Sequence, residues 1–127
     1  MRIQESAENY LETIHILSQG GKQVRSIDIS TQLDYAKPSV SVAMKKLRLD
    51  GYIVIDPSGF ITLTPTGKKI AESMYERHLF ISDWLVSLGV DKQTAAEDAC
   101  RIEHIISEQS FEAIKNYITG HNTQSTA

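Results

Sequence analysis

The sequence predicts a mostly α-helical chain in which an N-terminal winged helix-turn-helix is followed by a C-terminal helical domain. Three observations predict this fold class. Apolar residues recur at helical spacing along most of the chain, a tight turn separates a short helix from a basic helix, and two β-rich runs within residues 52–63 flank a turn containing proline and glycine. We expect domains at residues 1–69 and 70–120, followed by a disordered tail at residues 121–127.

The first predicted helix begins after Ser6, a suitable N-cap, and ends at Gly20-Gly21. Its apolar positions, three or four residues apart, are Ala7, Tyr10, Leu11, Ile14 and Leu17. Asn9 and Glu12 lie three residues apart and therefore share a polar face. That face is either a solvated stripe or a source of ligands.

The next two predicted helices form the helix-turn-helix. The first covers residues 25–33 with Ser26 as its cap, and a turn at residues 34–37 follows. Pro38 stands in the first turn of the second helix, where proline is tolerated, and that helix runs to about Asp50. Its apolar face is formed by Val40, Met44 and Leu47.

The outer face of this second helix is polar and basic, as in helices that enter the major groove of DNA. Its candidate DNA contacts are Lys37, Pro38, Ser39, Ser41, Val42, Lys45, Lys46 and Arg48. We expect the basic residues to contact phosphates and the serines and Val42 to face base edges. Because this face lacks an arginine fork, Asn and Gln, specificity is expected to depend on DNA shape. An ordinary solvated helix surface is the alternative.

Residues 52–55 and 60–63 are predicted strands, joined by a turn at residues 56–59. A hairpin directly after a recognition helix is the wing of a winged helix. Its tip, Pro57-Ser58-Gly59, carries no positive charge, so we expect only backbone contacts with DNA from it. A generic α+β module would give the same order of elements.

Composition and charge narrow the possible classes. The chain has 127 residues, of which 41% are hydrophobic and 23% charged, and no apolar run approaches the ~20 residues that span a bilayer. It lacks the apolar run of a secretory signal, and its single cysteine cannot form an internal disulfide, so we expect a cytoplasmic protein. Residues 1–69 hold nine Lys/Arg and seven Asp/Glu, whereas residues 70–127 hold four and nine. This imbalance suggests a polyanionic partner for the first part and a cation for the second.

A long helix is predicted to begin at Thr64-Pro65 and to end at Gly89, with His78 inside its apolar stripe. Asp91 can cap the following helix, and a last short amphipathic helix completes the domain. These three helices carry more apolar side chains than they can bury among themselves, so we expect a two-fold dimer. The residues expected in its contact include Phe80, Trp84, Phe111 and Ile114. Alternatively, they cover the winged helix.

Cys100, Glu103 and His104 lie three and four residues apart on the predicted helix after Asp91 and therefore share one face. A thiol, a carboxylate and an imidazole make a mixed ligand set that a borderline transition metal accepts. His78 and Glu12 are candidates for further ligands. Alternatively, the cluster is a coincidence on a polar helix face, or Cys100 and His104 are the nucleophile and base of a thiol enzyme. The sequence shows no Gly-rich loop or nucleophile elbow, which disfavours the enzyme.

Four stretches resemble those of a known family, the metal-dependent repressors related to the diphtheria toxin repressor and the manganese transport regulator. They are residues 8–14 in the first helix, 38–41 at the start of the recognition helix, 63–67 between wing and long helix, and 98–104 in the metal-binding helix. The resemblance covers about residues 5–118. It implies a homodimeric, metal-activated transcription repressor, not an enzyme, which binds a palindromic operator in double-stranded DNA and binds metal and dimerises through its C-terminal helical domain.

The resemblance implies a primary set of metal ligands: Glu12, His78, Cys100, Glu103 and His104. Asn9 falls where the iron branch has methionine and the manganese branch aspartate, and its amide oxygen is a weaker ligand. Glu12 resembles the manganese branch and Cys100 the iron branch, while Ser82 and Ala96 cannot supply the ligands of an ancillary site. We expect Fe(II) as corepressor, with Mn(II) as the alternative. The rival interpretation is a winged-helix regulator with a degenerate metal site that does not respond to metal.

Overall fold

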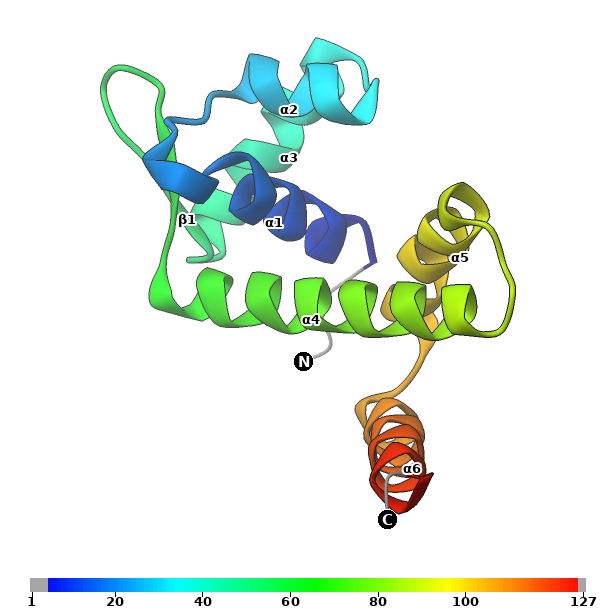
Figure 1. Cartoon of the computed structure of the whole chain (residues 1–127). Coiled ribbons are helices and arrows are strands. Elements are labelled where there is room, and N and C mark those ends of the chain that lie inside the picture. The colour runs from blue at the N-terminus through cyan, green and yellow to red at the C-terminus, as the bar shows by residue number, and fades with distance from the viewer. Residues whose placement is uncertain (1–4, 126–127) are drawn as a thin grey trace. The chain divides into compact units, whose positions relative to one another are not determined.

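The computed structural model describes residues 5–125 (Figure 1). Its elements in chain order are α1 (Glu5–Leu17), the short 3₁₀ helix η1 (Gln19–Gly21), α2 (Ser26–Leu33), α3 (Lys37–Leu49), β1 (Ile53–Ile55), β2 (Ile61–Leu63), α4 (Pro65–Ser87), α5 (Lys92–Ile105) and α6 (Glu108–Ser125). The predicted, mostly α-helical class is confirmed. The chain forms two compact units, of which the first ends at Tyr75 and the second begins at Glu76, so the boundary lies within α4.

The first unit is a winged helix whose core is supplied by α1, α2, α3, the hairpin, Val24 and the N-terminal part of α4. β1 and β2 pair antiparallel, with Ile53 opposite Leu63 and Ile55 opposite Ile61. The core consists of Tyr10, Leu11, Ile14, Val24, Ile29, Val40, Met44, Leu47, Ile53, Ile61 and Ala71. The buried side of α3 therefore matches the apolar face predicted from the sequence, and the opposite side is left to solvent.

The tight turn between α2 and α3 is fixed by local hydrogen bonds. Asp34 adopts a left-handed backbone conformation with φ 57°, which aspartate tolerates better than most residues. The Tyr35 amide donates to the Ser30 carbonyl at 3.1 Å, and the Ser30 hydroxyl donates to the Tyr35 carbonyl at 2.6 Å. This reciprocal pair sets the direction in which α3 leaves α2.

The turn of the wing follows the prediction from its Asp-Pro-Ser-Gly sequence. The Asp56 side chain accepts hydrogen bonds at 2.9 Å from the amides of Ser58 and Phe60. Gly59 has φ 86°, a conformation that favours glycine. Turn and register together confirm the predicted hairpin.

Two details of the helix ends differ from the sequence predictions. The N-cap of α2 is Arg25 and not Ser26, because the Asp28 carboxylate reaches back to accept the Arg25 amide at 2.9 Å. α6 continues through Ser125, into the segment predicted as a disordered tail. A single glycine such as Gly120 costs a helix only about 1 kcal/mol, which does not have to end it. The last two residues of that predicted tail, 126–127, lie outside the described residues.

Gly67 is required by a close approach between two backbones. It lies in the first turn of α4, and a Cβ added there would overlap the carbonyl oxygen of Tyr52. That oxygen also accepts a hydrogen bond from the Thr64 amide at 3.0 Å, so moving it away from Gly67 would weaken this hydrogen bond. Within a helix, alanine is normally more stable than glycine by about 1 kcal/mol. We expect Gly67→Ala to reverse this sign and to lower the free energy of unfolding by about 1–3 kcal/mol, a typical cost of overpacking.

Urea denaturation monitored by circular dichroism measures this effect, and Gly120→Ala is the matched control. Gly120 also lies inside a helix, but among residues 5–125 no atom beyond the adjoining turns of that helix lies within 4 Å of a Cβ added there. The control should be as stable as the native chain or more stable. A Gly67→Ala variant that behaves like the control would show that the backbone of Tyr52 gives way at no cost.

The second unit comprises the C-terminal part of α4 together with α5 and α6. Ile81, Ala99 and Phe111 form its buried centre, and the rings of Phe80 and Phe111 meet edge to face with centroids 5.8 Å apart. Asp91 caps α5 as predicted and accepts the Thr94 amide at 3.2 Å. Hydrogen bonding by Thr94, first through its side chain and then through its amide, holds the pKa of Asp91 below its usual value.

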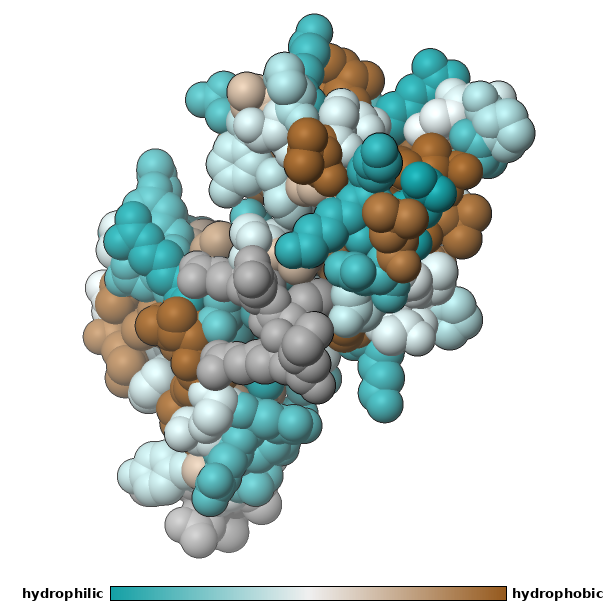
Figure 2. Space-filling model, turned by 180° about the vertical axis from the view of Figure 1, so that it is seen from behind, coloured by the Kyte–Doolittle hydropathy of each residue, from teal (hydrophilic) through white to brown (hydrophobic). Residues whose placement is uncertain are grey.

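Large apolar side chains also remain on the surface of the second unit. They are Leu79, Val86, Leu88, Ile105 and Tyr117. Figure 2 shows such apolar patches between hydrophilic side chains on one face of the molecule. Among the described residues, no helix combines the length and the apolar character needed to cross a membrane.

Candidate metal centre and nucleic-acid interface

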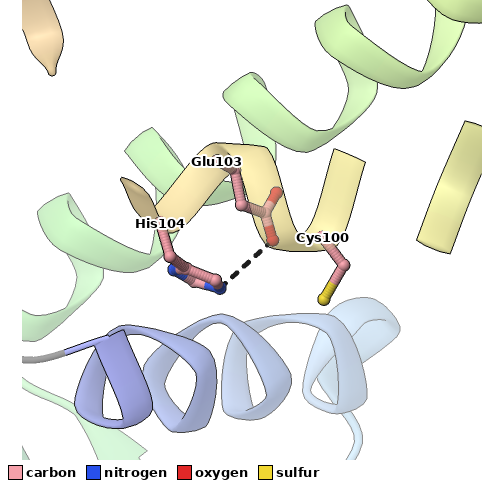
Figure 3. A group of neighbouring side chains, drawn as sticks. All are labelled: Cys100, Glu103 and His104. Atoms are coloured by element: carbon pink, nitrogen blue, oxygen red, sulfur yellow. Dashed lines mark ion pairs between the residues drawn. The ribbon is translucent and has the colours of Figure 1, made fainter. Parts of the chain in front are cut away.

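The last two turns of α5 bring three potential metal ligands onto one face. Cys100, Glu103 and His104 each offer a ligand atom, and these three atoms lie within 4.8 Å of one another (Figure 3). Their spacing of three and four residues produces this arrangement directly. Glu103 and His104 are buried, whereas Cys100 is exposed. The predicted cluster on α5 is therefore present as a spatial group.

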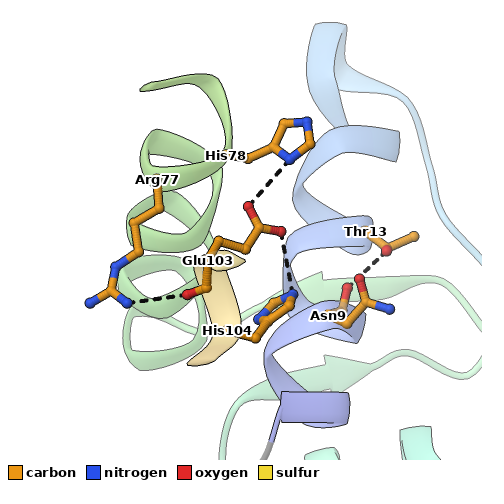
Figure 4. Close-up of polar contacts among 6 residues, drawn as sticks. All are labelled: Asn9, Thr13, Arg77, His78, Glu103 and His104. Atoms are coloured by element: carbon orange, nitrogen blue, oxygen red, sulfur yellow. Dashed lines mark hydrogen bonds and ion pairs between the residues drawn. The ribbon is translucent and has the colours of Figure 1, made fainter. Parts of the chain in front are cut away.

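α4 adds a second imidazole to this group. His78 Nδ1 lies 3.3 Å from Glu103 Oε2, and His104 Nε2 lies 3.3 Å from Glu103 Oε1 (Figure 4). One carboxylate thus faces two imidazoles, one through each of its oxygens. The thiol of Cys100 lies beside the same carboxylate. The second unit by itself gathers four of the five predicted primary ligands.

The donor set and its burial fit a divalent transition metal. The Glu103 side chain is 0% exposed, and a buried carboxylate is costly unless cations or hydrogen-bond donors surround it. His78 Nδ1 is buried, and its partner within the described part of the chain is the Glu103 carboxylate at 3.3 Å. An imidazole nitrogen that faces a carboxylate at this distance can share a metal ion with it. Two imidazole nitrogens, a carboxylate and a thiolate suit first-row metals of intermediate softness.

The fifth primary ligand, Glu12, and the weaker candidate Asn9 belong to the first unit. Glu12 and Asn9 lie on α1, where the Asn9 backbone carbonyl accepts a hydrogen bond from the Thr13 hydroxyl at 2.8 Å (Figure 4). Thr13 therefore binds the backbone of Asn9 and not its side-chain amide. Their ligation of a metal held in the second unit remains a prediction.

One residue of this region was not among the sequence candidates. Arg77 is buried and donates hydrogen bonds to the backbone carbonyls of Glu103 and Ile106. The only sequence signal was an arginine next to a histidine within an apolar stripe, and such a pattern does not identify its acceptors.

The predicted DNA face is fully presented by α3. All eight predicted contacts are exposed: Lys37, Pro38, Ser39, Ser41, Val42, Lys45, Lys46 and Arg48. Val42 is 71% exposed, which is unusual for an aliphatic side chain and suits a residue that packs against a thymine methyl. Ser26 and Ile27 of α2, which were not among the predicted DNA contacts, join Lys37 and Ser41 around a pocket of about 220 Å³ at the edge of this face.

Comparison with known proteins gives a match for the N-terminal and for the C-terminal part of the chain. Residues 2–59 match the N-terminal DNA binding domain of the iron dependent repressors, and residues 64–124 match the metal binding and dimerisation domain of the same family. The transcriptional regulator MntR of Salmonella typhimurium is 31% identical over 119 residues, which cover 94% of this chain and 76% of that protein. The HTH-type transcriptional regulator MntR of Lysinibacillus sphaericus is 32% identical over 113 residues, covering 89% and 81%.

Solved structures give the same result. The structure of the manganese regulator SloR superposes with a TM-score of 0.80 at 27% identity and covers 94% of this chain and 55% of that chain. The structure of IdeR from T. acidophilum has a TM-score of 0.71 at 25% identity and covers 92% and 55%. The present chain therefore spans about half the length of these solved structures.

A winged helix followed by a helical unit with clustered metal-ligating side chains defines a class, the metal-dependent DNA-binding regulators. Within this class, the chain belongs to the iron-dependent repressor family, the DtxR/MntR family of metal-dependent transcriptional repressors. Its relatives named above are transcriptional regulators and not enzymes, which agrees with the sequence prediction.

Proposed function

We propose that this chain is a metal-activated transcriptional repressor that controls iron or manganese homeostasis, with a divalent metal as its corepressor. The observation that carries the proposal is the group around Glu103, in which two imidazoles and a thiol surround one buried carboxylate. The ligands would be His78, Cys100, Glu103 and His104, with Glu12 and, more weakly, Asn9 from α1. A bound metal supplies the positive charge that lets these anionic side chains lie close together.

Regulation requires a coupling free energy between metal binding and DNA binding. Glu12 belongs to the DNA-binding unit, whereas Glu103 belongs to the other unit. Ligation by both would narrow the range of arrangements that the two units adopt. In a homodimer, this would fix the separation of the two α3 helices at the spacing of half-sites in a palindromic operator, about 34–36 Å.

We propose Fe(II) as the physiological metal, with Mn(II) as the alternative. Cys100 favours Fe(II), because Mn(II) binds thiolate poorly and Fe(II) tolerates one thiolate among oxygen and nitrogen ligands. The names of relatives such as MntR and SloR favour Mn(II). A reduced cytoplasm, which we propose as the location of this repressor, keeps both the thiol and Fe(II) in the required state.

Phosphate contacts by α3 should supply much of the DNA affinity. We expect Lys45→Ala to weaken binding to all DNA sequences alike and to reduce the slope of log affinity against log salt concentration by about 1, because one fewer counterion is released. Fluorescence anisotropy with operator and unrelated DNA over a salt series measures both effects. Lys92→Ala removes the same charge from α5 and should change neither. An effect of Lys45→Ala confined to one base position would mean that Lys45 reads sequence.

The homodimer should persist without metal, because its contacts are expected to come from apolar side chains. Phe111 is an exception among the residues predicted for this contact: it is 3% exposed and packs inside its own unit. The exposed apolar residues of this unit, such as Leu88 and Tyr117, are better candidates. Sedimentation of the chelated protein at micromolar concentration should give a dimer. A monomer under these conditions would make the metal a dimerisation switch.

The test of the proposed function is DNA affinity as a function of free metal. Purified protein is titrated anaerobically with Fe(II) or Mn(II), and operator binding is measured in metal and in chelator. We expect metal to tighten binding by about 5–150-fold, the usual range of allosteric coupling. Equal affinities in metal and chelator would reject metal activation.

The second candidate is a winged-helix regulator with a degenerate metal site. Its supporting observation is the pairing of Glu103 with two imidazoles, since protonated histidines would balance the carboxylate without a metal. Asn9 also supports this candidate, because its amide oxygen is a weaker metal ligand than a carboxylate. This candidate predicts that titration with Fe(II) or Mn(II) changes neither the absorption spectrum nor DNA affinity.

A further inference from the structure

Arg77 makes an unusual set of contacts inside the second unit. Its side chain lies on α4, and the residue is only 9% exposed. Its Nη1 donates to the backbone carbonyl of Glu103 at 3.2 Å, as Figure 4 shows, and also to that of Ile106 at 2.9 Å. Its guanidinium carbon lies 5.3 Å from the ring centroid of Phe111 on α6. One side chain therefore contacts the end of α5 and the start of α6.

These acceptors are the groups that the end of a helix leaves unsatisfied. The last four carbonyls of an α-helix lack partners within the helix, and a cation near this end is stabilising. α5 ends at Ile105, and Ile106 already has an extended backbone with φ −74° and ψ 138°. Arg77 thus holds the carbonyls on both sides of this end. A buried guanidinium is costly without such acceptors, so its position is tied to theirs.

The segment that Arg77 holds is the one that carries the metal-ligand group. Glu103 and His104 occupy the last turn of α5, and His78 directly follows Arg77 on α4. We propose that Arg77 is a positioning residue for the metal centre: its two hydrogen bonds set the distance between His78 and the carboxylate of Glu103. This proposal rests on the proposed function of the same site. Arg77 itself ligates nothing.

Two effects of Arg77, its positive charge and its positioning of α5, predict opposite changes in metal affinity when Arg77 is removed. A positive charge near a cation site weakens metal binding, so removing the charge alone should raise metal affinity. If Arg77 acts by holding the last turn of α5, its removal should lower metal affinity. Residues that orient metal ligands typically contribute 10–100-fold to affinity. The sign of the change therefore separates the two effects.

The experiment compares Arg77→Met with Ile81→Ala in the full chain. Methionine retains an apolar stem against Phe111 but has no donor. Ile81 is 2% exposed on the same helix, so Ile81→Ala loosens the core of the unit without removing a hydrogen bond to α5. Co(II) serves as the probe, anaerobically, with affinity measured by chelator competition and ligation followed by the thiolate-to-cobalt absorption band. We expect about a 10–100-fold loss of Co(II) affinity for Arg77→Met. Ile81→Ala should stay within about twofold of the native chain.

A second measurement needs no metal. Hydrogen exchange of the amides of residues 103–106 in chelated protein should accelerate in Arg77→Met more than in Ile81→Ala, because only the former frees the end of α5. Unchanged or higher Co(II) affinity in Arg77→Met overturns the proposal, as does equal exchange in the two variants. If the native chain binds no Co(II), the proposed function fails, and exchange still decides whether Arg77 holds α5.

Arg77→Lys decides the matter if Arg77→Met does not fold. Lysine keeps the charge but presents it on a shorter side chain, so it cannot reach both carbonyls in the way that arginine does. A reduced Co(II) affinity with an unchanged unfolding midpoint supports positioning. Native Co(II) affinity in Arg77→Lys overturns it.

Discussion

Replacing Glu103 by glutamine should abolish the metal dependence of DNA binding. Glu103 is the centre of the ligand group, with an imidazole nitrogen 3.3 Å from each of its oxygens. Glutamine has nearly the same shape but carries no charge, and its amide nitrogen is not a metal ligand at neutral pH. In saturating Fe(II), we therefore expect the operator affinity of Glu103→Gln to fall to the level measured in chelator, a loss of about 5–150-fold.

The measurement is operator binding in Fe(II) and in chelator, together with the unfolding midpoint of the chelated protein. The midpoint reports whether the variant still folds, because Glu103 pairs with two imidazoles and glutamine ends both pairings. Glu97→Gln is the control, since Glu97 lies exposed on the same helix and the charge change is identical. Full activation of Glu103→Gln by metal would exclude this carboxylate as a ligand.

The spatial grouping of the three candidate ligands on α5 could be predicted from sequence because its geometry is local. Cys100, Glu103 and His104 are neighbours on any α-helix, whatever that helix packs against. The exposure of the polar and basic face of α3 was predictable for a similar reason. Burial of Val40, Met44 and Leu47 on one side leaves the basic residues on the other.

Tertiary contacts to backbone atoms could not be predicted in this way. Arg77 donates to backbone carbonyls at the end of α5, so its role depends on where α5 ends relative to α4. The periodicity of apolar residues in the sequence does not encode this contact between two helices. Gly67 is similar, because its constraint comes from the carbonyl of Tyr52, which touches it in space but precedes the hairpin in the sequence. The cap of α2 was misassigned since serine is the commoner N-cap, whereas here Asp28 satisfies the Arg25 amide.

The distribution of ligands between the units bears on how the repressor responds to metal. The second unit alone supplies four donors, so it should retain some metal affinity even when α1 contributes none. Glu12 would then add less to affinity than to coupling, because it belongs to the unit that meets DNA. On this basis, metal binding and metal activation are separable properties, and metal selectivity should be set mainly by residues of α4 and α5.

Cys100 is the residue expected to control that selectivity, and Cys100→Glu should shift the preference from Fe(II) toward Mn(II). Cys100 offers the one sulfur among oxygen and nitrogen donors, and its exposure leaves room for a longer carboxylate. Exchange of a soft thiolate for a hard carboxylate favours the harder ion. We expect the ratio of the free Mn(II) to the free Fe(II) concentration needed for half-maximal operator binding to fall by about tenfold, or 1.4 kcal/mol.

The experiment is operator binding against free metal, performed anaerobically for both metals with the native chain, Cys100→Glu and Cys100→Ser. Serine removes the sulfur without adding a negative charge, so Cys100→Ser should weaken activation by Fe(II) and should not improve the response to Mn(II). A native chain that responds to Mn(II) at a lower free concentration than to Fe(II) would contradict the proposed metal. If Cys100→Glu leaves the ratio between the metals unchanged, the sulfur does not set selectivity, and the choice of metal must come from the number and geometry of the remaining ligands.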